Sequence, residues 1–202
     1  LFEENIQIPG IKYSLNPYDA GNGALVVNFN TVYLRIDQNG VISSAEEQTP
    51  LTPLAKHLGN KLTSGIHRVS IPPDSGFDYA GELLHTIFLR HGLSFKNRNV
   101  RLEKVSSAGQ LVYRHYNNLN LQEVIAGMML YSNNFIANQL LLTTGMKRFG
   151  SPATLKKGRL AVEEYLTKEL GISSDQFHIA EGSGISRKNL LTPDAVLLLL
   201  KS

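Results

Sequence analysis

Apolar residues recur at helical spacing on both sides of a short polar stretch in the second half of the chain. The apolar positions are Leu121, Val124, Ile125, Met128 and Met129 before the stretch, and Phe135, Ile136, Leu140 and Leu141 after it. This period is typical of amphipathic helices. The stretch itself contains Ser132, Asn133 and Asn134, residue types that form helices poorly because their side chains compete for backbone hydrogen bonds. Residues 121–145 therefore predict a helix–turn–helix joint that presents a hydroxyl and a carboxamide.

The first part of the chain has the pattern of a mixed β structure with one long helix. Runs of β-branched and aromatic residues alternate with turn signals, among them Asn39-Gly40, which favours a tight hairpin. The long helix is expected at residues 77–91, closed by Gly92, with an apolar face. That face comprises Leu83, Leu84, Ile87 and Phe88. The predicted strands of the chain are residues 23–36, 41–43, 66–71, 100–105, 110–113 and 177–180.

Other helices are marked by capping residues. Thr52-Pro53 and Thr192-Pro193 each place a hydroxyl before a proline at the first helical position. Ser151-Pro152 has the same form and predicts a helix that ends before Gly171. The change to mainly helical sequence near residue 117 predicts a domain boundary, with a mixed-β domain at 1–116 and a helical domain at 117–202. The fold class expected is α/β.

Composition excludes several classes of function. The chain has 202 residues, 42% of them hydrophobic and 18% charged, with a net charge of +3 and no basic block, so nucleic-acid binding is not indicated. Without cysteine there is neither a disulfide nor a thiolate metal site, and the six histidines lack metal-ligand spacing. We expect no metal. No apolar run approaches the roughly 18 residues of a membrane span. The chain opens at Leu1 without Met and stops after an apolar helix, which predicts a piece of a longer protein.

The polar joint allows two interpretations from local sequence. Ser132 could simply cap the second helix, since serine is a preferred N-cap residue. Alternatively, Ser132 and Asn134 could form the Ser-x-Asn element of penicillin-interacting serine enzymes.

Two longer motifs favour the second interpretation. Residues 132–141 read Ser-Asn-Asn-Phe-Ile-Ala-Asn-Gln-Leu-Leu, and residues 181–193 read Glu-Gly-Ser-Gly-Ile-Ser-Arg-Lys-Asn-Leu-Leu-Thr-Pro. Together they resemble the D-alanyl-D-alanine carboxypeptidase/endopeptidase family of class C low-molecular-mass penicillin-binding proteins, peptidase family S13. Residues 24–30 and 80–84 are similar to parts of the domain inserted in this family. Family members usually carry Asp where Glu181 stands.

The resemblance implies serine acyl transfer on peptidoglycan stem peptides, with β-lactams as covalent inhibitors and no cofactor. It implies a proton-relay role for Ser132 and an amide-binding role for Asn134. Asn133 matches the variable middle position and is a candidate for substrate binding only. In fold, it implies the helical part of a transpeptidase-like domain joined to a β-rich inserted domain. It also implies an exported or periplasmic protein.

Two of the family's motifs are absent from the 202 residues: the nucleophilic Ser-x-x-Lys and the carboxylate-binding Lys-Thr-Gly. Thr143-Thr144-Gly145 lacks the lysine, and we expect its glycine to end a helix. We therefore expect a fragment that begins inside the insertion and is inactive alone. The alternative is a non-catalytic peptidoglycan-binding or scaffolding homologue that has lost these motifs. Gly182-Ser183-Gly184 is interpreted as a turn that supports the site wall, with glycine allowing positive φ.

Overall fold

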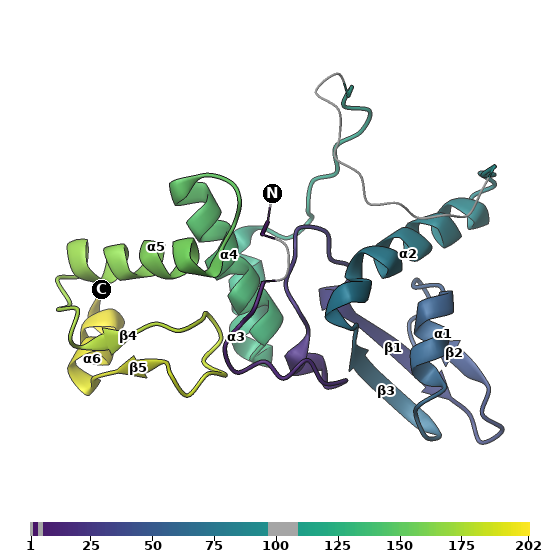
Figure 1. Cartoon of the computed structure of the whole chain (residues 1–202), viewed down its shortest axis with the longest axis horizontal. Helices are drawn as coiled ribbons and strands as arrows, with labels where there is room; N and C mark the ends of the chain where they lie inside the picture. The colour runs from purple at the N-terminus through teal and green to yellow at the C-terminus, as the bar shows by residue number, and fades with distance from the viewer. Residues whose placement is uncertain (1, 4–5, 97–108) are drawn as a thin grey trace.

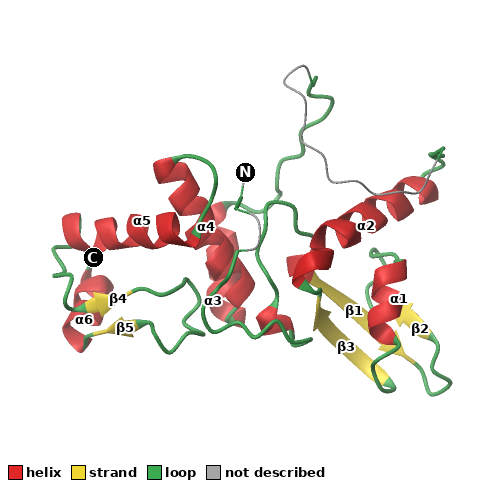
Figure 2. Cartoon of the chain, in the orientation of Figure 1, coloured by secondary structure: helices red, strands yellow, loops and turns green. Residues whose placement is uncertain are grey.

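The computed structural model describes residues 2–3, 6–96 and 109–202 and combines helices with two small sheets, as the α/β prediction requires (Figure 1; Figure 2). A three-stranded sheet with α1 and α2 lies at one end of the molecule, and α5, α6 and a two-stranded ribbon lie at the other (Figure 1). The strands are β1 (Thr31–Ile36), β2 (Ile42–Ser44), β3 (Gly65–Ser70), β4 (Phe177–His178) and β5 (Leu190–Leu191). The α-helices are α1 (Pro53–Gly59), α2 (Gly76–Arg90), α3 (Leu121–Tyr131), α4 (Asn134–Phe149), α5 (Leu155–Lys168) and α6 (Pro193–Lys201). Short 3-10 helices are η1 (Pro17–Asp19), η2 (Asn28–Asn30) and η3 (Pro73–Ser75).

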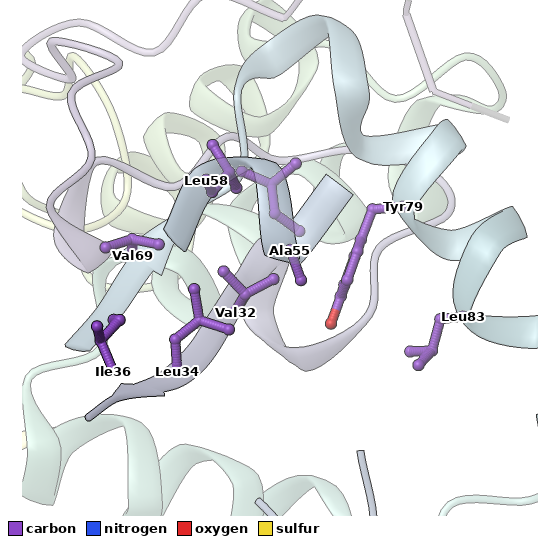
Figure 3. Close-up of a cluster of buried hydrophobic side chains, with 9 residues drawn as sticks. Val32, Leu34, Ile36, Ala55, Leu58, Val69, Tyr79 and Leu83 are labelled. Atoms are coloured by element: carbon purple, nitrogen blue, oxygen red, sulfur yellow. The ribbon is translucent and has the colours of Figure 1, made fainter. Parts of the chain in front are cut away.

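The three-stranded sheet is antiparallel, in the order β2-β1-β3, and buries one face. Alternate residues of β1 point to the same side of the sheet, and those on the buried side pack with α1 and α2 (Figure 3). The buried cluster contains Val32, Leu34, Ile36, Ala55, Leu58, Val69, Ile71, Tyr79 and Leu83. The predicted hairpin is confirmed, with Gly40 at φ +79° and Ile36 paired with Ile42. This end of the molecule thus has a closed apolar core.

The first predicted strand is shorter than expected. The prediction starts it at residue 23, but β1 begins at Thr31. Asn28, Phe29 and Asn30 all have positive φ and form η2 instead. Asparagine tolerates the left-handed region because its short side chain can hydrogen-bond locally, and Asn30 donates to the carbonyl of Gly21 at 3.0 Å. Local turn chemistry overrides the β propensity of residues 24–27.

The prediction of paired strands at residues 100–105 and 110–113 is wrong for the second of them, which the structure describes. Residues 110–113 form no strand, and Val112 is 94% exposed. Residues 100–105, the predicted partner, lie outside the described residues. Strand propensity reflects packing on a half-buried surface more than an intrinsic backbone preference, and the side chains of residues 110–113 are exposed.

Helix starts follow the capping pattern with one exception. Thr52 and Thr192 cap α1 and α6 as predicted. The hydroxyl of each threonine accepts a hydrogen bond from the backbone nitrogen three residues later in the chain. The prediction that Ser151-Pro152 starts a helix is wrong, because α5 begins at Leu155 with Thr154 as its N-cap. The Thr154 hydroxyl accepts from the backbone nitrogen of Lys157 at 3.1 Å.

The prediction that Gly145 ends a helix is also wrong. α4 continues to Phe149, and Gly145 lies inside it at the closest approach to α5. A Cβ atom at this position would stand 2.3 Å from the backbone nitrogen of Gly158. The glycine is required by helix–helix packing rather than by termination.

The segment at the start of the chain packs on the helical part. Ile6, Ile8 and Ile11 share a buried cluster with Leu142 of α4 and with Ala153. Residues 1–116 therefore do not all lie against the sheet. The boundary at residues 116 and 117 stays a prediction.

Two helices leave most of their apolar surface open. α3 has no buried residue, and Met129 and Leu130 are 70% and 74% exposed. Such an apolar stripe normally faces a core, but on α3 it is exposed, although Leu141 and Leu142 of α4 are buried. On α6 only Ala195 is buried. Half of the face predicted for α2 is likewise open: Leu84 and Phe88 are 45% and 41% exposed. Among the residues that the structure describes, no helix combines the length and apolarity that crossing a membrane requires.

Candidate active site

The predicted helix–turn–helix joint is confirmed, with Ser132 at its centre. Ser132 adopts the left-handed conformation (φ 50°, ψ 50°) and ends α3. The next backbone nitrogen, that of Asn133, donates to the carbonyl of Met128 at 3.0 Å, which satisfies an otherwise free end of α3. Ser132 is exposed. A non-glycine residue in this region is uncommon, and this conformation places Ser132 in the turn between α3 and α4.

Asn133, and not Ser132, caps the following helix. Its side-chain oxygen accepts a hydrogen bond from the backbone nitrogen of Ile136 at 2.9 Å. The local interpretation in which Ser132 caps the second helix is therefore wrong, because the left-handed turn places Ser132 one residue too early. Capping uses one of the two lone pairs of the Asn133 oxygen, so this oxygen can accept one further hydrogen bond and the amide nitrogen can still donate.

Asn134 opens α4 and is half-buried. Within the described part of the chain, neither its carboxamide nor the Ser132 hydroxyl forms a side-chain hydrogen bond. Both groups are thus available to an outside molecule or to a further part of a longer protein. The carboxamide can donate two hydrogen bonds and accept two, and the hydroxyl can donate and accept.

The first turns of α4 are tied to a distant segment near the start of the chain. The side-chain nitrogen of Asn22 donates to the carbonyl of Phe135 at 2.9 Å and to the side chain of Gln139 at 3.0 Å. Gln139 in turn donates to the carbonyl of Gly23 at 2.9 Å. The rings of Phe29 and Phe135 meet edge to face with centroids 6.2 Å apart. These contacts fix the helix that carries Asn134.

The loop between β4 and β5 contacts α4 from another part of the sequence. It contains the predicted turn, and Gly184 has φ +81°, which confirms the role of that glycine. Glu181 is only 2% exposed. Burial alone would raise the pKa of its carboxyl group, but hydrogen bonds from the Ser183 hydroxyl and backbone and from the Ser186 backbone outweigh burial and lower the pKa below 4.5. The carboxylate is therefore ionised at neutral pH.

These observations agree with the comparison with known families. The sequence profile of the D-Ala-D-Ala carboxypeptidase 3 (S13) family matches residues 23–202. The chain belongs to this family. The match includes both motifs, at residues 132–141 and 181–193, and most of the first half.

Relatives with known names agree with this family assignment. D-alanyl-D-alanine carboxypeptidase DacB of Haemophilus influenzae is 33% identical over 123 residues, which cover 61% of this chain and 25% of that protein. The D-alanyl-D-alanine carboxypeptidase of Actinomadura sp. (strain R39) is 32% identical over 123 residues, 60% of this chain and 22% of that protein.

The fold is that of a solved penicillin-binding protein. Penicillin-binding protein 4 (dacB) from H. influenzae matches 99% of this chain with a TM-score of 0.73 at 20% identity, and the match covers 51% of that protein. The same protein in complex with a novel β-lactam matches 89% of this chain, with a TM-score of 0.67 and 23% identity, over 47% of its own length. The chain thus spans about half of the solved structure and about a quarter of the named relatives' length.

A groove of about 400 Å³ lies between α4 and α5, lined by Arg148, Glu164 and Lys168 among others, near the far ends of these helices. Lys168 and Arg148 hydrogen-bond to Glu164 and lower the pKa of that carboxyl group. In the described part of the chain no His, Cys, Asp and Glu side chains gather into a group of three or more that could hold a metal ion.

Sequence reasoning missed the residues that hold α4 in place. Asn22 and Gln139 lie more than 100 positions apart, so no local pattern links them. Asn138 does carry a signal in the sequence, because it is a polar residue in an apolar helical run. It is fully buried, with its side-chain oxygen accepting from the backbone nitrogen of Gly182.

Proposed function

We propose that residues 1–202 form part of a serine-type D-Ala-D-Ala carboxypeptidase and endopeptidase that acts on peptidoglycan stem peptides through an acyl-enzyme. The observation that carries the proposal is the α3–α4 joint. There Ser132 and Asn134 stand at the spacing of the Ser-x-Asn motif with no side-chain hydrogen bond to the described residues. The match of residues 23–202 to the S13 family supports it.

The two side chains have complementary tasks in this reaction. When a serine nucleophile attacks the peptide carbonyl, the leaving D-alanine nitrogen must gain a proton before it departs. Ser132 can accept a proton from a neighbouring group and pass its own to that nitrogen, as general acid–base catalysis requires. Asn134 can donate its amide hydrogens to the carbonyl of the substrate peptide and hold the reacting bond in place.

The remaining machinery is not in these 202 residues. Neither Ser-x-x-Lys nor Lys-Thr-Gly occurs in the sequence, so the nucleophile, its lysine base and the carboxylate clamp would come from further parts of a longer protein. A serine hydroxyl needs an adjacent base to become a strong nucleophile. Residues 1–202 alone should therefore form no acyl-enzyme. Residues 117–202 would be the helical part of the catalytic domain, and most of residues 1–116 its insertion.

The proposal also implies which molecules the protein binds and in which compartment it works. β-Lactams would be covalent inhibitors, because a stable acyl-enzyme is the expected product of their attack by the nucleophile. One of the similar solved structures is itself a complex with a novel β-lactam. The reaction requires no metal or cofactor. Peptidoglycan lies outside the cytoplasmic membrane, so the protein would be exported or periplasmic.

The experiment is labelling with a fluorescent penicillin of a polypeptide that contains residues 1–202 with their flanking sequence. Replacement of Ser132 by alanine should slow acylation by about 100-fold or more, the usual contribution of a proton-transfer group. The matched control is Ser174→Ala, a serine in an exposed turn. Equal acylation of the Ser132→Ala and control variants would mean that Ser132 only ends a helix.

A second candidate function rests on the missing motifs themselves. If the flanking sequence also lacks Ser-x-x-Lys and Lys-Thr-Gly, the protein is a non-catalytic homologue that binds or organises peptidoglycan. It would then remain unlabelled by penicillin and would still sediment with purified peptidoglycan.

A further inference from the structure

The Glu181 carboxylate is buried and bound mainly by hydrogen-bond donors of its own loop, and the side chain of Asn138 on α4 also helps to lower its pKa. Its oxygens accept from the backbone nitrogen and hydroxyl of Ser183, at 2.7 and 2.6 Å, and from the nitrogen of Gly184 at 2.8 Å. They also accept from the nitrogen of Ser186 and from the side chain of Asn189. Among the described residues, no cation pairs with it. Because a buried charge is tolerated only when it is well solvated by donors, this carboxylate holds the loop in one shape.

The loop held in this way rests directly on α4. The backbone nitrogen of Gly182 donates to the side-chain oxygen of Asn138 at 2.7 Å. A Cβ atom at position 182 would lie 2.7 Å from the carbonyl oxygen of Ala137, so the backbones touch with no room for a side chain. Asn138 is 0% exposed. The contact is therefore a rigid one between Gly182 and the second turn of α4.

Asn138 follows Asn134 by one helical turn, on the same side of α4. A displacement of the second turn therefore moves the first turn, which carries Asn134 and begins at the Ser132 joint. Catalytic side chains must be held within about 0.5 Å of their working position. Loop and helix thus form a continuous path from the buried carboxylate to the proposed site.

We propose that Glu181 is a positioning residue, which acts through Gly182 and Asn138 to fix the turn of α4 that carries Asn134. This inference rests on the proposed function, since it assigns the network a task in acyl transfer. It goes beyond the motif itself, because Glu181 touches no candidate catalytic group and acts only through the helix.

The first test uses residues 1–202, with NMR resonances of Ser132, Asn133 and Asn134 as the readout. Glu181→Gln removes the charge while keeping the size, and should shift these resonances and raise hydrogen exchange at Ala137 by about tenfold, as loss of a charge-assisted hydrogen bond does. Glu181→Asp keeps the carboxylate and should restore part of the wild-type spectrum. Glu169→Gln is the matched control, because Glu169 is exposed at the end of α5 and forms no salt bridge within the described part of the chain.

A second variant distinguishes loss of the proposed link from general unfolding of the chain. Asn138→Ala leaves the hydrogen bonds within the Glu181 loop intact and cuts the link to α4. It should shift the same resonances at the joint, while exchange protection in β1 stays unchanged in every variant. If Glu181→Gln loosens only the loop and leaves the resonances of Ser132 and Asn134 where they are, the proposal is overturned.

The second test uses the polypeptide with flanking sequence and measures the rate of acylation by penicillin. Glu181→Gln should slow acylation by about tenfold or more at unchanged thermal stability of the sheet, with Glu181→Asp closer to wild type. Acylation of Glu181→Gln at the wild-type rate would overturn the positioning role. Should the wild-type polypeptide fail to react at all, the proposed function fails, and the resonances of residues 132–134 still decide whether Glu181 sets the geometry of the joint.

Discussion

The sheet part and the helical part of the molecule differ in how completely they bury their own apolar residues. Around the three-stranded sheet, Leu34 and Tyr79 are each 1% exposed, and α1 and α2 close the core (Figure 3). In the helical part, α4 and α5 pack closely, but α3 buries no residue and exposes Met129 to 70%. A helix that is apolar all round is normally buried. The difference indicates that the sheet part has a closed core of its own, whereas α3 beside Ser132 leaves its apolar side chains exposed in the described structure.

The largest effect should come from the closed core. Leu34→Ala should lower the free energy of unfolding by about 2–5 kcal/mol, because it removes buried methyl groups and leaves a cavity. The matched control is Leu130→Ala in α3, where the leucine is 74% exposed. That change should stay within about 0.5 kcal/mol. Denaturant unfolding of both variants checks the comparison, and equal destabilisation would refute it.

An intermediate loss of stability is expected for a substitution where α4 crosses α5. Gly145→Ala would place a methyl group 2.3 Å from the nitrogen of Gly158, which forces the helices apart. We expect destabilisation of about 1–3 kcal/mol. In α3, Gly127 has open space around it, so Gly127→Ala should be neutral or stabilise by about 0.5–1 kcal/mol. Thermal denaturation of the pair shows whether the α4–α5 contact is as tight as the sheet core. A Gly145→Ala variant that is more stable than the wild type would contradict the close packing of α4 on α5.

The smallest expected effect is a local loss of stability at acidic pH. Glu181 has a pKa lowered below 4.5 in the folded chain, so the unfolded chain binds more protons between the folded-state pKa and 4.5. Its contribution to stability is present in full above that window and is lost as pH falls through the folded-state pKa. Hydrogen exchange between pH 5 and pH 3 should therefore loosen the amide of Gly182 before those of β1. A Glu181→Gln variant should show a weaker dependence on pH there, and an identical dependence would exclude this carboxyl group as the cause.

Local signals in the sequence predicted most elements, because capping and turn residues act within a few positions. Thr52, Thr192 and Gly40 each determine their neighbourhood by hydrogen bonding or by positive φ, and the structure agrees. The joint at Ser132 was predicted for the same reason. The prediction fails where distant contacts decide: a glycine after Thr143-Thr144 indicates a helix end, but Gly145 packs against Gly158 of α5, which no local pattern reveals.

Sequence patterns predict only the residues of the candidate site that are open to other molecules, and not those that hold them in place. Ser132 and Asn134 lie two positions apart in the sequence and belong to a recognisable motif. Of the groups that hold them, Asn138 lies on the same helix as Asn134, but Asn22 and Glu181 come from segments that meet this helix only in the folded chain. No spacing rule brings such segments together. The strand predicted at residues 110–113 failed for a related reason, since propensity does not provide a partner.

The most direct test of the central claim is a structure of the polypeptide with its flanking sequence after acylation by a β-lactam. The account predicts that the Ser132 hydroxyl and the Asn134 carboxamide both lie within hydrogen-bonding distance of the inhibitor or of its attachment residues, at about 2.7–3.2 Å. It also predicts that α3 is covered in that structure. An acylated serine on a face of the molecule that neither Ser132 nor Asn134 can reach would contradict the account.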